Sequence, residues 1–278
     1  MKKILALILA MMMVLGMFAA CGVENQTAPT TTAPTEAAGA TEGTEADEEA
    51  NATLETIEAG KLIMSTNAEF PPYEMTDDSG KYIGIDVEIA TAIAEKLGLE
   101  LDILDVDFDA ALLAVNEGKS DMVMAGVTVN DDRKVVMDFT DSYATGKQVV
   151  IVKEGSDVTF DNLGEKMIGT QRATTGNIYA SDDYGEEHVT AYDNGATAVQ
   201  ALMNGQVDCV IIDNAPAQEY VKANAGLTIL ETEYVIEEYA IGCDKGNTAL
   251  VDAINAALAE LTEDGTIQSI LDKYITAA

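Results

Sequence analysis

The chain is poor in basic residues. It has 15 lysine and arginine residues against 49 aspartate and glutamate residues, and its formal net charge is −34 over 278 residues. Nucleic-acid-binding proteins need a basic surface, and docking on anionic lipid needs clustered lysine and arginine. The composition therefore argues against both kinds of partner, while it says little about the charge of a small ligand.

Tryptophan is absent, and there are only one histidine and three cysteines. Cys209 and Cys243 lie in apolar runs, which favours two buried thiols, although an extracellular location leaves a disulfide open. Neither cysteine has metal-ligand spacing with His188. We therefore expect no metal and no cofactor.

The N-terminus has the features of an export signal. Met1-Lys2-Lys3 is basic, residues 4–20 are apolar, and Cys21 follows Ala-Ala directly. This order is typical of a secretory signal, and the apolar run is shorter than the ~20 residues that span a bilayer. The cysteine resembles that of a bacterial lipobox, with Phe18 where leucine is usual. The resemblance implies removal of residues 1–20 and a lipid on Cys21, with an uncleaved anchor helix as the alternative.

Residues 21–53 are predicted to be a disordered acidic tether. The segment is rich in Ala, Thr, Glu and Pro, and residues 23–52 contain no Lys, Arg or aromatic residue. Such a segment cannot bury enough apolar surface to offset its ordering entropy. We therefore expect an extracytoplasmic protein that is lipid-anchored to the cell membrane.

The remainder, about 225 residues, is long enough for two domains. Apolar patterns predict strands at 61–66, 99–106, 120–125, 148–152, 166–169, 207–212 and 239–243. Helices are predicted at 87–97, 108–117, 196–203, 215–223, 249–261 and 265–274, with Asp86 as the N-cap of the first helix. The alternation predicts an α/β fold with a largely parallel sheet. A strand–helix–strand unit that ends in an Asp-rich turn occurs twice, which suggests two similar lobes.

Ligands of α/β folds bind at the carboxyl ends of strands, so the segments after the predicted strands are informative. They are Asn67-Ala-Glu-Phe-Pro-Pro-Tyr-Glu74, Gly126-Val-Thr-Val-Asn-Asp-Asp-Arg-Lys134, Val136-Met-Asp-Phe-Thr-Asp-Ser-Tyr143, Thr170-Gln-Arg-Ala-Thr-Thr-Gly176 and Asp213-Asn-Ala-Pro216.

In this order the segments resemble those of extracellular solute-binding proteins of ABC importers, in the polar amino acid branch, over residues 57–275. The resemblance implies a type II periplasmic-binding-protein clamshell with two hinge crossings, near Gly146 and Ala240. Lobe 1 would comprise residues 54–145 and 245–278, and lobe 2 residues 146–244. It further implies a monomer that binds one free amino acid between its lobes and delivers it to a membrane permease.

The charges of a free amino acid both need partners once they leave water. Arg133 can form two parallel bonds to the α-carboxylate, and Thr174 and Thr175 can add donors at a helix N-terminus. Asp213 can accept from the α-ammonium. Read singly, Arg133 fits a solvated helix charge, and the other three fit helix caps.

Further residues complete the predicted ligand site. Phe70 and Phe108 offer apolar faces to the ligand side chain, although each alone would fit a core residue. The resemblance adds Ala125, Gly126 and Thr128 as contacts to the ligand's main-chain groups. The family usually has glycine where this chain has Ala173.

The side-chain end of the site is expected to include Asn67, Glu69 and Gln171. Relatives that take lysine or arginine often have an acid in place of Asn67. The neutral amide, which can donate and accept, favours a glutamine-like ligand, while Glu69 keeps a cationic amino acid as the alternative.

An enzyme is the competing class, because the resemblance includes secreted dehydratases on the same scaffold. General acid–base catalysis most often uses histidine, and His188 lies in a charged segment away from the strand ends, although a cluster of Glu69 and Glu74 stays open. A receptor input domain would need a membrane span after the domain, and none follows up to Ala278. We therefore expect a binding protein and no catalysis.

Overall fold

The computed structural model describes residues 54–230 and 234–275. They belong to one compact unit. The predicted signal, Cys21 and the predicted tether lie outside the described residues, so the fold bears on none of them.

A mixed sheet forms the centre of this unit. Its strand order is β5 (Glu100–Asp105), β1 (Lys61–Thr66), β6 (Met122–Val123), β12 (Val235–Asp244), β7 (Met137–Lys153), β10 (Cys209–Asp213), β8 (Ile168–Gln171) and β9 (Val189–Tyr192), and β11 (Leu227–Ile229) also pairs with β7. A second, small sheet contains β2 (Glu69–Phe70), β3 (Glu74–Thr76) and β4 (Tyr82–Ile83).

The prediction of a largely parallel sheet is correct only at its two ends. Strand β1 is parallel to β5 and β6, and β8 is parallel to β9 and β10. In the middle, β7 and β12 are antiparallel to each other and to their other neighbours. Residues 137–147 were expected to be outside any strand, but they belong to the 17-residue strand β7.

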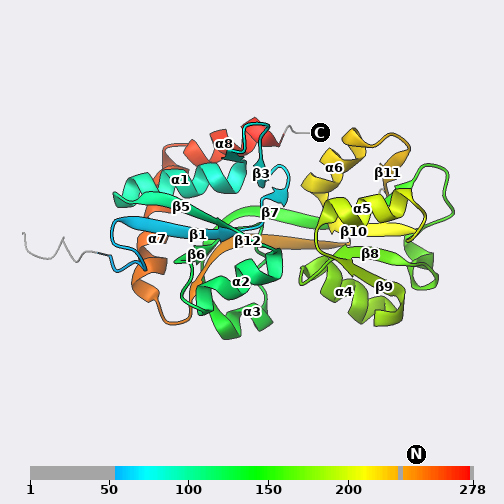
Figure 1. The fold of residues 1–278 in the computed structure, drawn as a ribbon, viewed down its shortest axis with the longest axis horizontal. Coiled ribbons are helices and arrows are strands. Elements are labelled where there is room, and N and C mark those ends of the chain that lie inside the picture. Colours follow the sequence, from blue (N-terminus) through cyan, green and yellow to red (C-terminus); the bar gives the residue numbers. More distant parts are fainter. Residues whose placement is uncertain (1–53, 231–233, 276–278) are drawn as a thin grey trace, which may run out of the picture. The chain divides into compact units, whose positions relative to one another are not determined.

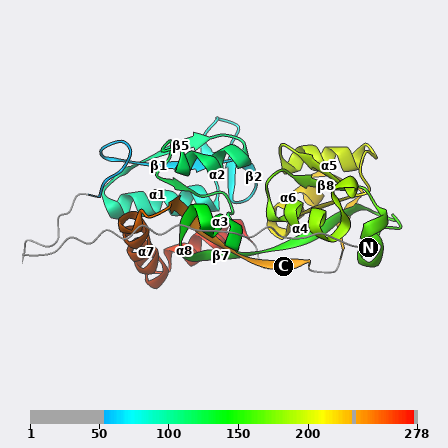
Figure 2. The ribbon, with the colours of Figure 1, turned by 90° about the horizontal axis from the view of Figure 1, so that it is seen from below.

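Helices flank the two ends of the sheet (Figure 1). The first lobe has β5, β1 and β6, with α1 (Ile85–Leu97), α2 (Phe108–Asn116), α3 (Asp131–Val136), α7 (Thr248–Glu263) and α8 (Thr266–Tyr274). The second lobe has β8 to β11, with α4 (Thr175–Tyr184), α5 (Gly195–Met203), α6 (Asn214–Ala223) and the 3-10 turns η1 (Phe160–Glu165) and η2 (Glu186–His188). Strands β7 and β12 run from one lobe to the other (Figure 2).

The two long strands are pressed together near Gly146. A Cβ atom on this glycine would lie 2.0 Å from the hydroxyl of Tyr239, which crosses β7 at this point. Real Cβ atoms do not approach another atom so closely, so a residue without a side chain is needed here. The glycine thus lets Tyr239 reach from β12 into the space between the lobes.

Helix α1 begins two residues earlier than predicted. Its N-cap is Gly84, at φ +130°, where a Cβ would lie 2.2 Å from the carbonyl oxygen of Tyr73. The predicted cap, Asp86, is inside the first turn and is buried. Its Oδ2 accepts hydrogen bonds from Gly126 N and from the Tyr143 hydroxyl, each at 2.9 Å. The helix ends as predicted, with Gly98 in the left-handed conformation.

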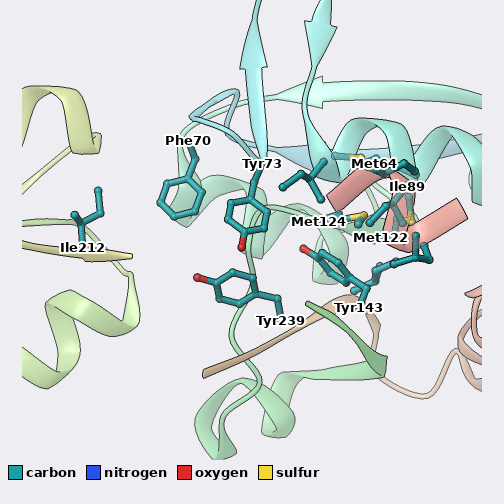
Figure 3. Packing of buried hydrophobic residues seen from close by; sticks show 14 of the residues in the cluster. Met64, Phe70, Tyr73, Ile89, Met122, Met124, Tyr143, Ile212 and Tyr239 are labelled. Carbon is teal, nitrogen blue, oxygen red and sulfur yellow. The ribbon is translucent and has the colours of Figure 1, made fainter. Parts of the chain in front are cut away.

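The core is built from aliphatic residues, methionine and tyrosine. Figure 3 shows Met64, Met122 and Met124 packed near Ile89 in the first lobe. Cys209 and Cys243 are buried free thiols, as the apolar runs around them favoured. Burial raises the pKa of both thiols to about 12, so neither is a reactive thiolate at neutral pH.

Within the described ranges, none of the helices combines the length and the apolar character needed to cross a bilayer.

Candidate functional site

The strand ends of both lobes converge on one cavity. It holds about 320 Å³ of space, its open mouth included, at the lower end of the volumes usual for small-molecule sites. It is lined by Asn67, Phe70, Glu74, Phe108, Ala125, Gly126, Thr128, Arg133, Gln171, Thr174, Thr175 and Asp213. Apart from Glu69, the structure thus brings together the residues that the sequence analysis assigned to the ligand, and it adds Glu74.

Arg133 is a buried cation and not a solvated helix charge. It lies on α3, whose N-cap Asn130 accepts from the Arg133 backbone N–H at 2.8 Å, and the residue is only 8% exposed. Its guanidinium donates to the carbonyls of Thr128 (2.9 Å) and Ala173 (3.1 Å) and lies 5.5 Å from the ring centroid of Phe108. Burial lowers its pKa, but an arginine stays charged at any physiological pH.

Ala173 carries the backbone strain that a glycine would avoid. Its φ is +61°, the left-handed region in which side chains are unfavourable. The strained turn aims the Ala173 carbonyl at the guanidinium of Arg133 from the second lobe. A glycine, which the resemblance led us to expect here, would adopt this turn without that strain.

The two threonines at the start of α4 have different roles. Thr174 is the N-cap, with its hydroxyl accepting from Asn177 N at 3.2 Å and donating to the Gln171 carbonyl at 2.7 Å. Thr175 is buried, and its hydroxyl lies 3.4 Å from that of Thr128 in the first lobe. The cap interpretation therefore holds for the Thr174 side chain, while the Thr175 hydroxyl faces the cavity.

Asp213 ends β10 at the N-cap position of α6, yet its side chain makes no cap hydrogen bond. Its carboxylate accepts instead from the hydroxyl of Tyr239. Figure 3 shows that hydroxyl pointing toward the side of the second lobe on which Ile212 lies. Burial, and next the charge of Glu237, raise the pKa of Asp213 to about 7. The group is therefore poised to take up a proton or a cation.

A second buried acid lines the cavity from β3. Glu74 is fully buried, and neither carboxyl oxygen has a hydrogen-bond donor in the described ranges, apart from a proton that it can share with Asp86. Burial and the charge of Asp86 raise the pKa of Glu74 well above its usual range, and burial raises that of Asp86 to about 6. Sequence reasoning missed Glu74 as a lining residue, although it shares a loop segment with Asn67 and Phe70.

The side-chain end differs from the expectation in one residue. Asn67 and Gln171 line the cavity, and their amides join the lobes, with Gln171 Nε2 donating to Asn67 Oδ1 at 3.0 Å. Asn67 Nδ2 donates to the Val106 carbonyl at 3.1 Å. Glu69 is exposed outside the cavity lining, and it accepts from Asn194 Nδ2 at 2.8 Å. The prediction that Glu69 lines the side-chain end of the site is therefore wrong, because β2 turns this side chain toward solvent.

The residues considered for catalysis in the sequence analysis are not brought together at the cavity. His188 ends η2 and is not among the lining residues, and Glu69 points away from Glu74. No group of His, Cys, Asp and Glu suited to a metal ion exists in residues 54–230 and 234–275. What the lining offers is a buried guanidinium, buried carboxyls, hydroxyls and aromatic faces.

Residues 62–277 match the model of the bacterial extracellular solute-binding proteins, family 3. The chain belongs to this family. A probable histidine-binding protein of Neisseria gonorrhoeae is 34% identical over 77% of this chain and 83% of its own length. The ABC transporter arginine-binding protein 1 of Escherichia coli is 31% identical over 78% of this chain and 91% of its own.

The solved structures agree with the two-lobed fold. An ancestral arginine-binding protein bound to glutamine has a TM-score of 0.75 at 38% identity, over 79% of this chain and 100% of that protein. This chain therefore has the type II clamshell fold of the amino acid-binding proteins of ABC transporters. It is a transport protein and not an enzyme. The members of this family are extracellular proteins.

Proposed function

We propose that the cavity captures one free polar amino acid and that the loaded protein delivers it to the permease of an ABC importer. The observation that supports this most strongly is the placement of opposite charges. Arg133 from the first lobe and Asp213 from the second are both buried at one cavity. A zwitterion has one group for each, and a buried charge needs such a partner.

The main-chain groups of the ligand would be held as follows. The guanidinium of Arg133 has five N–H donors. Two backbone carbonyls accept from some of these donors, so others remain for the α-carboxylate. The N-terminus of α4 and the Thr175 hydroxyl would add donors to the same group. Asp213 would accept from the α-ammonium, and Phe70 and Phe108 would cover the aliphatic part of the side chain.

The ligand side chain would meet Glu74, and this changes the preference for glutamine. That preference depended on Asn67, whose amide nitrogen and oxygen are both engaged with the protein. Glu74 is a lining carboxyl without a fixed donor, which suits a cationic side chain such as that of arginine. Glutamine stays the second candidate, because its amide can donate to Glu74 in either protonation state, and because one solved relative binds it.

Two further features belong to this proposal. The lobe boundaries would lie at residues 146 and 245, with hinge crossings near Gly146 and Ala240 on the two shared strands. Cys21 would carry the lipid that holds the monomeric protein at the outer side of the cell membrane, with residues 21–53 as the tether.

Calorimetry of the refolded, ligand-free protein against the twenty amino acids tests the function. We expect arginine to bind more tightly than glutamine in the wild type. In Glu74→Gln the preference should fall by at least about 10-fold, because a buried charge partner is worth roughly 1.5–3 kcal/mol. If the ratio of arginine affinity to glutamine affinity is the same in the wild type and in Glu74→Gln, then Glu74 does not contact the ligand side chain. A protein that binds none of the twenty would contradict the proposed function.

The carboxylate contact is tested by Arg133→Ala. Loss of the partner of a buried charge costs several kcal/mol, so we expect at least about 100-fold weaker binding of arginine by calorimetry. The neighbouring variant Lys134→Ala, on the exposed side of α3, is the matched control and should bind as the wild type does. Unchanged affinity in Arg133→Ala would place the site elsewhere.

The anchor is tested by metabolic labelling with a fatty acid in bacteria that express the full chain. Cys21→Ser should lose the label and leave an unprocessed or released protein. Cys209→Ala, which changes a buried thiol of the folded unit, should keep the label. A labelled Cys21→Ser protein that is cut at the same bond would refute the lipobox interpretation.

A further inference from the structure

Glu237 is a buried acid beside the site that the proposed recognition of an amino acid does not use. It lies on β12 and is only 4% exposed. Gln148 Nε2 donates to its Oε2 at 2.8 Å, while Oε1 has no hydrogen-bond partner within the described ranges. A buried carboxylate with one unpartnered oxygen is costly unless another group completes it.

Strand pairing puts this acid on the same sheet face as Asp213. Across antiparallel strands, Glu237 is opposite Gly146, and Asp213 is opposite Gln148. Gly146 and Gln148 are two apart on β7, so all these positions project from one face. The amide of Gln148 therefore lies between two buried carboxyls, and its own oxygen also lacks a donor in the described part of the chain.

Other charged and titratable groups act on this pair from every side. Arg133 on α3 is the cation that interacts with both Asp213 and Glu237. Tyr179 on α4 interacts with Glu237, and Tyr239 on β12 donates to Asp213. Glu74, on the far side, adds another acid that interacts with Asp213. Among the described residues around this pair, the acids thus outnumber the guanidinium of Arg133, and the surplus negative charge is buried.

We propose that Glu237 is a further acid of the ligand site, and that its buried carboxyl, acting through Gln148, keeps a proton on Asp213 in the empty site, which the ligand's α-ammonium displaces. Glu237 acts as a positioning residue through Gln148 and Asp213. This inference rests on the proposed function, because it takes the ammonium of a free amino acid as the group that arrives.

The charge balance gives the reason. Two neighbouring carboxylates that are removed from water cannot both ionise cheaply, and a proton is the smallest cation that relieves them. An ammonium brings one positive charge and three N–H donors, so it can replace the proton. Binding then releases a proton to solvent, and the ammonium replaces its positive charge beside the acids, while the α-carboxylate is balanced by Arg133.

The pH dependence follows in sign. The raised pKa of Asp213, about 7, means that the empty site keeps its proton below neutral pH and loses it above. Below pH 7 the ammonium must displace that proton, so affinity falls as the pH falls, by up to about tenfold per pH unit. Above pH 8 the proton is already gone, and affinity levels off.

Calorimetry with L-arginine in two buffers of different ionisation heat measures the released proton. At pH 6 we expect about one proton released per ligand, and at pH 8, where the ligand's α-ammonium is still charged, close to none. L-glutamine, which has the same α-ammonium, should release the same number if it binds. Tight binding with no proton release and a flat affinity between pH 5.5 and pH 8 would overturn the inference, while the proposed function would stand.

Two matched variants locate the effect. Glu237→Gln keeps the size and hydrogen bonding of the side chain but removes one acid, so the midpoint of the affinity-against-pH curve should move to lower pH. Glu238→Gln changes the next residue on β12, which is exposed, and should leave the midpoint unchanged. If the midpoint is the same in Glu237→Gln and in the wild type, Glu237 does not help to keep the proton on Asp213.

A titration without ligand separates this inference from the proposed function. Carboxyl-carbon NMR of the ligand-free protein should show Asp213 titrating near neutral pH, identified by its loss in Asp213→Asn, and at lower pH in Glu237→Gln. If the Asp213 signal shows a fully ionised carboxylate at pH 5, the proposed proton on Asp213 is refuted, whichever ligand the protein binds.

Discussion

The pairing of β7 with β12 is the constraint on which the rest of the described structure depends. These strands continue from one lobe into the other, and every other strand of the main sheet reaches them directly or through neighbours. Gly146 allows Tyr239 to cross between them, and the same segment carries Gln148 and Glu237. The ladder that joins the lobes thus also supplies the polar groups behind Asp213, so that the proposed hinge and the proposed site share residues.

A buried electrostatic imbalance follows from this arrangement. Asp213 and Glu237 interact with Arg133, and Glu74 and Asp86 add two more buried acids to this part of the described structure. Burial raises the pKa of Glu74, Asp86 and Asp213. Removing charges from water is costly when their partners are missing. A ligand that brings an ammonium group reduces this cost, and one with a cationic side chain reduces it further. In the proposed function, an amino acid would relieve this buried excess of negative charge.

Much of this could be predicted from the sequence. The segments at strand ends identified the lining residues because carboxyl ends of neighbouring strands meet in α/β folds, and Gly98 marked the end of α1. The antiparallel centre could not be predicted, because buried and exposed positions do not alternate regularly over residues 137–147. The sequence there lacks the period of two that indicates a strand. Side-chain direction was also beyond local patterns, since Glu69 and Glu74 are close in sequence and only the small sheet of β2 and β3 turns one outward and one inward.

The central claim is that one ligand is held by groups from both lobes. Contacts that exist only in the closed form make the ligand favour closure, because a ligand shifts a conformational equilibrium only through contacts that differ between the states. Small-angle X-ray scattering of the protein from residue 54 onward, with and without saturating arginine, measures this directly. The account predicts a smaller radius of gyration with arginine. An unchanged radius, under conditions in which calorimetry shows the site to be filled, would contradict it.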